Sequence, residues 1–168
     1  MFKKDQFVVY PAQGVGIVEN ITEKEVGGLK TEFYIIRILS NNGTVMVPIA
    51  NAENVGLRCV CNPKHAKKVL AYLADWSDFK GYAGQNWNRR YREYGEKLKS
   101  GDLFDVAYVL KELILISKDK ELSFGERRLM EQAMNLICSE LSLSLNKDVE
   151  DIKNEIKEIF KDILEQEK

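Results

Sequence analysis

The residues best suited to chemistry lie in the segment 86–94, Asn-Trp-Asn-Arg-Arg-Tyr-Arg-Glu-Tyr, which holds three arginines and three aromatic residues. Guanidinium groups contact phosphates, and a flat ring at a helix start can stack on an unpaired base or insert into an opened base step. On a helix, Trp87, Arg90 and Tyr91 would share one face. The pattern alone somewhat favours an ordinary helix instead, with Trp87 and Tyr91 in the core and the arginines in solvent.

A second basic pair, Arg127 and Arg128, falls in the first turn of a predicted helix. Ser123 and Glu126 match a capping box at the start of that helix. Helix N-termini attract anions, and basic side chains there oppose the helix dipole, so a bound phosphate is one reason for this pair. Two surface arginines beside acidic neighbours explain it equally well.

Signatures of catalysis and of metal binding are weak. The sequence has no G-x-x-x-x-G-K-[ST] loop, no G-x-S-x-G elbow and no H-E-x-x-H motif. Cys59, Cys61 and His65 are three candidate metal ligands, but structural zinc sites usually have four ligands. The simpler interpretation is a strand that ends there. We therefore expect no enzyme activity, no metal and no cofactor.

Charge is distributed unevenly along the chain, although the net charge is only −1. Residues 61–128 carry 14 basic and 10 acidic side chains, whereas residues 129–168 carry 5 basic and 10 acidic ones. The middle of the chain therefore suits a polyanionic partner better than the end does. No apolar run approaches the ~20 residues of a membrane span, and no apolar signal core follows Met1, so we expect a cytoplasmic protein with reduced thiols and no membrane partner.

The first 60 residues predict short strands joined by tight turns at 26–29 and 40–43. The predicted strands are 7–10, 17–21, 33–39, 44–47 and 55–58. Five short strands bury little as an open sheet, so we expect them to curl into a small barrel.

After Pro63 the apolar spacing becomes helical. Asn86, Asp102 and Ser123 are predicted N-caps, 77–85 a loop, and 149–163 a final helix with near-heptad apolar spacing. The fold class is therefore α+β, a small Tudor- or SH3-like β-barrel over residues 1–61 followed by an all-α bundle over 62–168.

Five sequence blocks, in this order, resemble the CarD/CdnL family of bacterial transcription regulators. They are residues 10–16, 46–48, 55–58, 87–93 and 122–127. Each block alone is weak, but five in register make the resemblance specific, and it spans residues 2–145. It also reverses the preference for an ordinary helix at Trp87.

The resemblance implies a division of labour. The barrel is similar to the polymerase-interacting domain of transcription-repair coupling factors and would dock on the RNA polymerase β subunit. The helical domain would contact promoter DNA at the upstream edge of the melted bubble, with Trp87 as a minor-groove wedge, and so stabilise the open complex. The implied DNA-binding residues are Trp87, Arg89, Arg90, Arg92 and Arg127, and we add Arg128 from the basic pair at the helix start. The expected polymerase-binding residues are Tyr10, Pro11, Val45, Met46, Val47 and Pro48.

Three positions depart from the family pattern. Glu25 and Met46 stand where some members carry arginines that pair with polymerase, so docking here would rely more on apolar contact and strand addition. Gln132 stands where some members have a lysine. We expect a short, stand-alone monomer. The rival hypotheses are a polymerase adaptor without DNA contact, a small nucleic-acid-processing enzyme, and a protein that self-associates through the 149–163 stripe.

Overall fold

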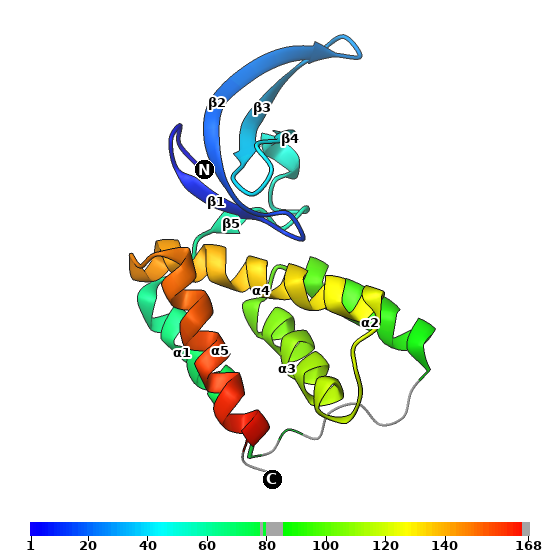
Figure 1. Cartoon of the computed structure of the whole chain (residues 1–168). Coiled ribbons are helices and arrows are strands. Elements are labelled where there is room, and N and C mark those ends of the chain that lie inside the picture. The colour runs from blue at the N-terminus through cyan, green and yellow to red at the C-terminus, as the bar shows by residue number, and fades with distance from the viewer. Residues whose placement is uncertain (78, 80–85, 166–168) are drawn as a thin grey trace. The chain divides into compact units, whose positions relative to one another are not determined.

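The structure is a computed structural model that describes residues 1–77, 79 and 86–165 (Figure 1). The chain forms two compact units, Met1–Val60 and Cys61–Lys168, called here the β unit and the helical unit. The first is a five-stranded antiparallel sheet and the described part of the second contains five helices, so the predicted α+β class is confirmed. The boundary falls one residue before the expected one.

The β unit is a strongly curved sheet (Figure 1) with the order β4-β3-β2-β1-β5. Its strands are β1 (Phe7–Tyr10), β2 (Gly14–Val26), β3 (Leu29–Ile38), β4 (Thr44–Pro48) and β5 (Arg58–Cys59), with a short 3₁₀ helix, η1 (Ile49–Asn51), after β4. The two end strands, β4 and β5, do not pair with each other in this sheet, so closure into a barrel by hydrogen bonds is incomplete. The last strand also begins later than predicted, because Val55 and Gly56 lie in a turn.

Alternation along β3 supplies the core of the β unit. Tyr34, Ile36 and Ile38 are at most 1% exposed. Their neighbours along the strand are less buried, as expected for a sheet with one face inward. Gly16 lies opposite Ile38 in the β2–β3 ladder, and a Cβ at position 16 would come within 2.6 Å of Ile36 Cγ2. Close approach of the two strands therefore requires glycine there.

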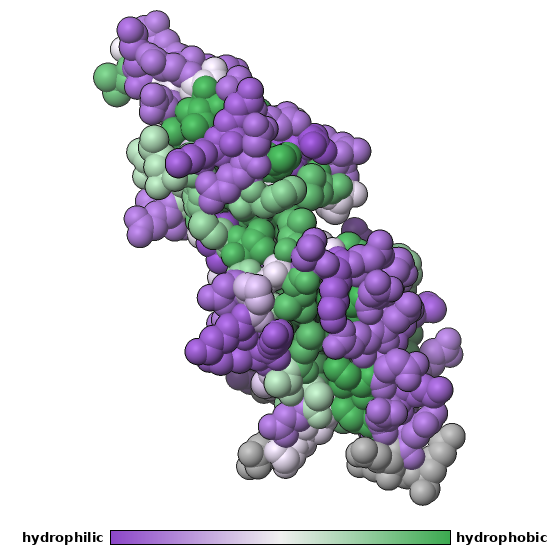
Figure 2. Space-filling view, turned by 90° about the vertical axis from the view of Figure 1, so that its left-hand side faces the viewer, coloured by the Kyte–Doolittle hydropathy of each residue, from purple (hydrophilic) through white to green (hydrophobic). Residues whose placement is uncertain are grey.

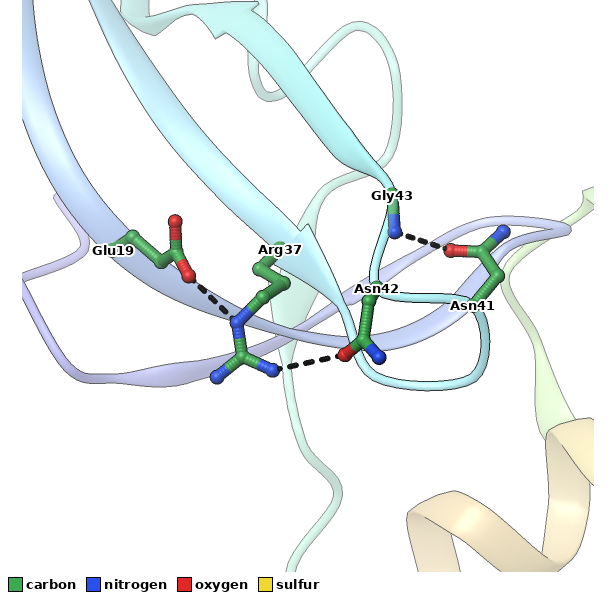
Figure 3. Close-up of polar contacts among 5 residues, drawn as sticks. All are labelled: Glu19, Arg37, Asn41, Asn42 and Gly43. Carbon is green, nitrogen blue, oxygen red and sulfur yellow. Dashed lines mark hydrogen bonds and ion pairs between the residues drawn. The ribbon is translucent and has the colours of Figure 1, made fainter.

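The β3–β4 turn is fixed by polar contacts (Figure 3). Arg37 Nε lies 2.6 Å from Glu19 Oε1, and Arg37 Nη1 donates to Asn42 Oδ1 at 3.3 Å. The Gly43 amide donates to Asn41 Oδ1 at 2.7 Å, and Asn42 has a φ of 56°. This confirms the predicted turn, and it sets the residue at which β4 begins.

Within residues 61–77, 79 and 86–165, the helical unit contains five helices and one continuous core. They are α1 (Pro63–Ala74), α2 (Trp87–Lys99), α3 (Leu103–Asp119), α4 (Phe124–Leu145) and α5 (Val149–Glu165). The side chains of Asn86, Asp102 and Ser123 accept backbone hydrogen bonds at the starts of α2, α3 and α4, so the three predicted caps are confirmed. Most of the loop predicted at 77–85 lies outside the described residues.

Two helices show where the core lies. α3 is apolar on most sides and packs against α1, α2 and α4. α5 buries Ile152, Ile156 and Phe160 against the same bundle, where it contacts α1 and α4. The stripe that suggested self-association is therefore covered by its own unit.

Lys111 is a buried lysine at the centre of the helical unit, 1% exposed. Its ammonium donates to the carbonyls of Tyr72 and Asp75 at 2.8 and 2.6 Å, which satisfies the C-terminal end of α1. It also lies 4.0, 5.1 and 4.7 Å from the ring centroids of Tyr72, Trp76 and Phe79. Burial lowers the pKa of Lys111, although the charge of Asp75 opposes this.

Several large apolar side chains remain exposed. Hydrophilic residues cover most of the face drawn in Figure 2, with hydrophobic residues in strips between them. The most relevant exposed apolar residues are Leu29, Met46, Tyr91 and Phe124. Among the described helices, none has the length and apolar character needed to cross a bilayer.

We expect Lys111→Met to lower the free energy of unfolding by about 3 kcal/mol, because two partly buried carbonyls lose a charged donor. Lys67→Met is the matched control, since Lys67 is exposed on α1. Urea denaturation followed by circular dichroism measures both. Equal, small effects would show that the buried ammonium does not stabilise the end of α1.

Candidate nucleic-acid interface and docking edge

Trp87 sits where the first turns of two helices meet. Asn86 Oδ1 accepts from the Arg89 amide at 2.9 Å, so α2 begins at Trp87. The indole is partly buried against the helical core. A Cβ at Gly125, in the first turn of α4, would lie 3.2 Å from the indole Cζ2, so the ring packs directly on the α4 backbone. The Trp87 side chain is therefore packed against α4 and is not free in solvent.

Four exposed arginines lie near this contact in the sequence. They are Arg89, Arg92, Arg127 and Arg128, called here the basic rim. All four lie in the first two turns of α2 and α4, the two helices whose starts meet at the indole. Arg89 pairs with Glu93 at 3.4 Å, but such an exposed pair is weak and leaves the guanidinium accessible. Five of the six predicted DNA-binding residues therefore lie in the first two turns of α2 or α4.

Arg90, the sixth, is in a different environment from the one expected. Its residue is 7% exposed, and its guanidinium carbon lies 5.3 Å from the indole centroid of Trp87. Arg90 Nη1 lies 3.7 Å from Glu126 Oε2. Because its side chain is buried, Arg90 is less accessible to a phosphate than the four exposed arginines, and we no longer expect it to contact DNA directly.

Glu126 combines two tasks at the start of α4. Its Oε1 accepts from the Ser123 amide at 3.0 Å, and its own amide donates to Ser123 Oγ at 3.2 Å, which confirms the capping box. Lys120 Nζ lies 3.4 Å from the same Oε1. Burial raises the pKa of Glu126, but the hydrogen bonds from Ser123 and the charge of Lys120 outweigh it, so the pKa lies below its ordinary value. The carboxylate is therefore charged at neutral pH.

Two aromatic residues beside the indole were not predicted as site residues. Tyr91 is 53% exposed, with its ring centroid 5.5 Å from that of Trp87. Phe124 is 75% exposed at the first position of α4, next to Gly125. An apolar residue directly after a cap, off the apolar stripe of its own helix, is the sequence signal that identifies Phe124.

The candidate polymerase-docking strand, β4, is an end strand paired only with β3. Val47 is 2% exposed and Val45 partly buried, so these two side chains serve the core. Met46 is 39% exposed and points outward, with Lys24 Nζ 3.9 Å from its sulfur. Pro48 ends the strand. What β4 offers a partner is therefore its backbone edge and Met46.

Tyr10 and Pro11 lie elsewhere in the sheet. Tyr10 ends β1 and packs partly against the β-unit core. Pro11 follows it and lies against Gly56, where a Cβ would come within 3.1 Å of Pro11 Cγ. Because β2 and β3 separate β1 from β4, the sheet does not place these two residues beside the β4 edge.

The three candidate metal ligands have other environments. Cys59 is exposed, 3.6 Å from Gln6 Nε2. The Cys61 amide donates to Glu140 Oε2 at 2.9 Å, and the His65 ring packs on Phe104 at 5.2 Å between centroids. Within the described ranges, no three His, Cys, Asp or Glu side chains gather into a possible metal site.

Comparison with known families decides the relationship. Residues 2–60 match the CarD-like/TRCF RID domain, and residues 68–157 match the CarD C-terminal domain. The chain belongs to the CarD family. YdeB of Bacillus subtilis (strain 168), named as a candidate transcription factor, is 29% identical to this CarD-family chain over 143 residues, which cover 85% of this chain and 92% of YdeB. The family is one of transcription factors, and the β unit is its RNA polymerase-interacting type of domain.

We expect Gly125→Ala to move the indole of Trp87 without unfolding the helical unit. The added methyl would meet the ring at 3.2 Å, while alanine favours a helix by up to ~1 kcal/mol over glycine. The chain has two tryptophans. Labelling it with 5-fluorotryptophan gives one ¹⁹F resonance for each, assigned with Trp76→Phe.

Movement of the Trp87 resonance alone, with the melting temperature within a few degrees of the parent, is the expected result. Gly95→Ala on α2 is the control, because no atom lies within 4 Å of a Cβ there. An unshifted Trp87 resonance in Gly125→Ala would contradict the packing of the indole against Gly125.

Proposed function

We propose that this chain binds the RNA polymerase β subunit through its β unit and stabilises the open promoter complex with its helical unit. The observation that carries the proposal is the seating of Trp87 where two helix starts meet within the basic rim. The proposed DNA contacts lie at the upstream edge of the melted bubble and do not read sequence.

The packing of Trp87 against α4 suits a side chain that inserts into an opened base step. An aromatic ring that fills an opened base step must be presented in one orientation, because ordering a loose side chain costs about 0.5–1.5 kcal/mol on binding. One edge of the indole is fixed against Gly125, and the residue keeps some exposure. The exposed ring of Tyr91 lies next to the indole, and Phe124 is a second exposed aromatic residue in the first turn of α4.

The basic rim suits phosphates on a deformed duplex. Two helix N-termini add free amides and positive dipole ends to the four guanidinium groups. Such contacts position a protein on DNA and weaken as salt rises, but carry no sequence information. Binding should therefore follow the shape of the bubble edge.

A modest energy is enough for this function. A difference of ~1.4 kcal/mol in affinity between open and closed promoter states shifts their ratio about tenfold. One stacked ring contributes ~1–3 kcal/mol per base in single-strand complexes. Stacking of the indole alone therefore supplies enough energy for a tenfold shift toward the open state.

The β4 edge suits docking by strand addition. An unpaired edge offers a row of backbone donors and acceptors to an extended partner segment, with Met46 as an apolar side-chain contact. Glu25, exposed opposite Lys30, supplies no positive charge where some members have arginine. Docking raises the local concentration of the helical unit at the promoter, so a single monomer acting on polymerase at the nucleoid suffices.

A polymerase adaptor that never touches DNA is the second candidate. The match of residues 2–60 to a domain type shared with TRCF favours it, since that half alone explains polymerase binding. Footprinting on a bubble template separates the two, because the adaptor leaves the upstream edge unprotected.

We expect Trp87→Ala to bind polymerase as the parent chain does but to shorten open-complex lifetime about tenfold, because the strands re-anneal without expelling a ring. Competitor challenge on a linear promoter measures the lifetime. Trp76→Phe, which changes the other tryptophan, is the control. Parent-like lifetime with Trp87→Ala would remove the wedge from the mechanism.

We expect Met46→Asp to weaken binding to the β subunit about tenfold, because it places a charge beside the docking edge. Leu29→Asp is the matched control, since Leu29 is 72% exposed at the far end of β3. Titration of the full chain with purified β subunit measures both. Similar affinities for the two variants would exclude β4 as the docking strand.

A further inference from the structure

Arg90 is an arginine of the DNA-contacting segment that faces away from solvent. It follows Trp87 by three residues on α2, so the two side chains are neighbours on the helix. The guanidinium carbon lies 5.3 Å from the indole centroid, within the range of a cation–π contact. Because a planar cation over an aromatic face fixes the ring's plane, Arg90 acts on the indole from a second side.

Arg90 faces Glu126 of α4 in a buried ion pair that is too long for a hydrogen bond. The Glu126 residue is 1% exposed, and its Oε2 lies 3.7 Å from Arg90 Nη1. Its other oxygen accepts from the Ser123 amide, so the α4 cap fixes the carboxylate. One chain of contacts therefore runs from the cap of α4 through Glu126 and Arg90 to the indole.

Arg90 also has a buried neighbour on α2. Tyr94, 2% exposed, follows Arg90 by one helical turn. Burial and the neighbouring Glu112 raise the pKa of Tyr94, while Arg90 opposes that rise. Arg90 therefore has a second buried polar neighbour on its own helix.

Stability alone does not explain this buried pair. Removing two charges from water costs about as much as their attraction returns, and apolar residues of similar size often stabilise a core at least as well. Buried charges give a defined geometry instead, since a planar guanidinium has directional contacts. The group whose geometry this pair controls is the indole of Trp87.

We propose that Arg90 and Glu126 are positioning residues for Trp87, and that the pair holds the indole in the orientation in which it enters an opened base step. This proposal rests on the proposed function of Trp87 as a wedge. Neither residue contacts DNA. They act through the indole.

Glu126→Gln in the full chain is the primary test. Glutamine keeps the capping-box oxygen for the Ser123 amide but removes the charge that faces Arg90. We expect the ¹⁹F resonance of 5-fluorotryptophan at position 87 to move and broaden, while that of Trp76 stays. Open-complex lifetime should fall roughly three- to tenfold, at unchanged polymerase affinity. Glu131→Gln, an exposed carboxylate on the same helix, is the control for charge.

Arg90→Lys covers the case in which Glu126→Gln fails to fold. Lysine keeps the positive charge beside Glu126 but loses the planar contact with the ring. We expect a moved Trp87 resonance with a melting temperature closer to that of the parent chain.

The outcomes separate this proposal from the wedge itself. A Trp87 resonance unchanged in both variants would overturn the positioning role, whatever the lifetimes. A moved resonance with parent-like lifetime would also overturn it if Trp87→Ala shortens the lifetime. If Trp87→Ala leaves the lifetime unchanged, the wedge fails, and with it the functional part of this proposal.

Discussion

The contact between the Trp87 indole and the Gly125 backbone is the constraint on which the helical unit's site depends. It joins two residues 38 positions apart through the starts of two helices, each fixed by a local cap. Because a cap determines the residue at which its helix begins, shifting either cap by one residue would rotate the ring or the backbone beneath it. The basic rim lies in the first two turns of the same helices, so the same two caps determine where the indole and the four arginines lie.

The rest of the helical unit packs around the helices that make this contact. α3 is buried against three other helices, and Lys111 closes the end of α1 that precedes the segment leading to Trp87. The β unit has the opposite character at β4, where an end strand leaves backbone groups unpaired within its sheet. A rigid helix pair and an available strand edge suit different partners, which agrees with the two matched domain types of the CarD family.

Features set by neighbouring residues could be predicted from the sequence. The caps at Asn86, Asp102 and Ser123, the turn before β4 and the alternation along β3 all follow from local chemistry. The environment of Arg90 could not, because a helix pattern does not state which face packs inward once charged and aromatic residues share it. Nor could the contact with Gly125, since only tertiary packing brings α4 to α2. The sheet does not close fully because β5 is only two residues long. The sequence predicted a longer strand here, since the turn at Val55 and Gly56 could not be told from the start of a strand.

The proposed mechanism assigns different thermodynamic tasks to the arginines and to the indole. Phosphates are present in both closed and open promoters, so the basic rim binds both, and a ligand that binds two states equally shifts nothing. An unstacked base step exists only in the open state, so the indole supplies the difference in affinity. A fully buried ring would be unable to reach that step, and a fully exposed ring would lose orientational freedom on entering it. Trp87 lies between these limits, seated on Gly125 and kept in plane by Arg90. For this reason a buried arginine belongs to the site although no phosphate can reach it.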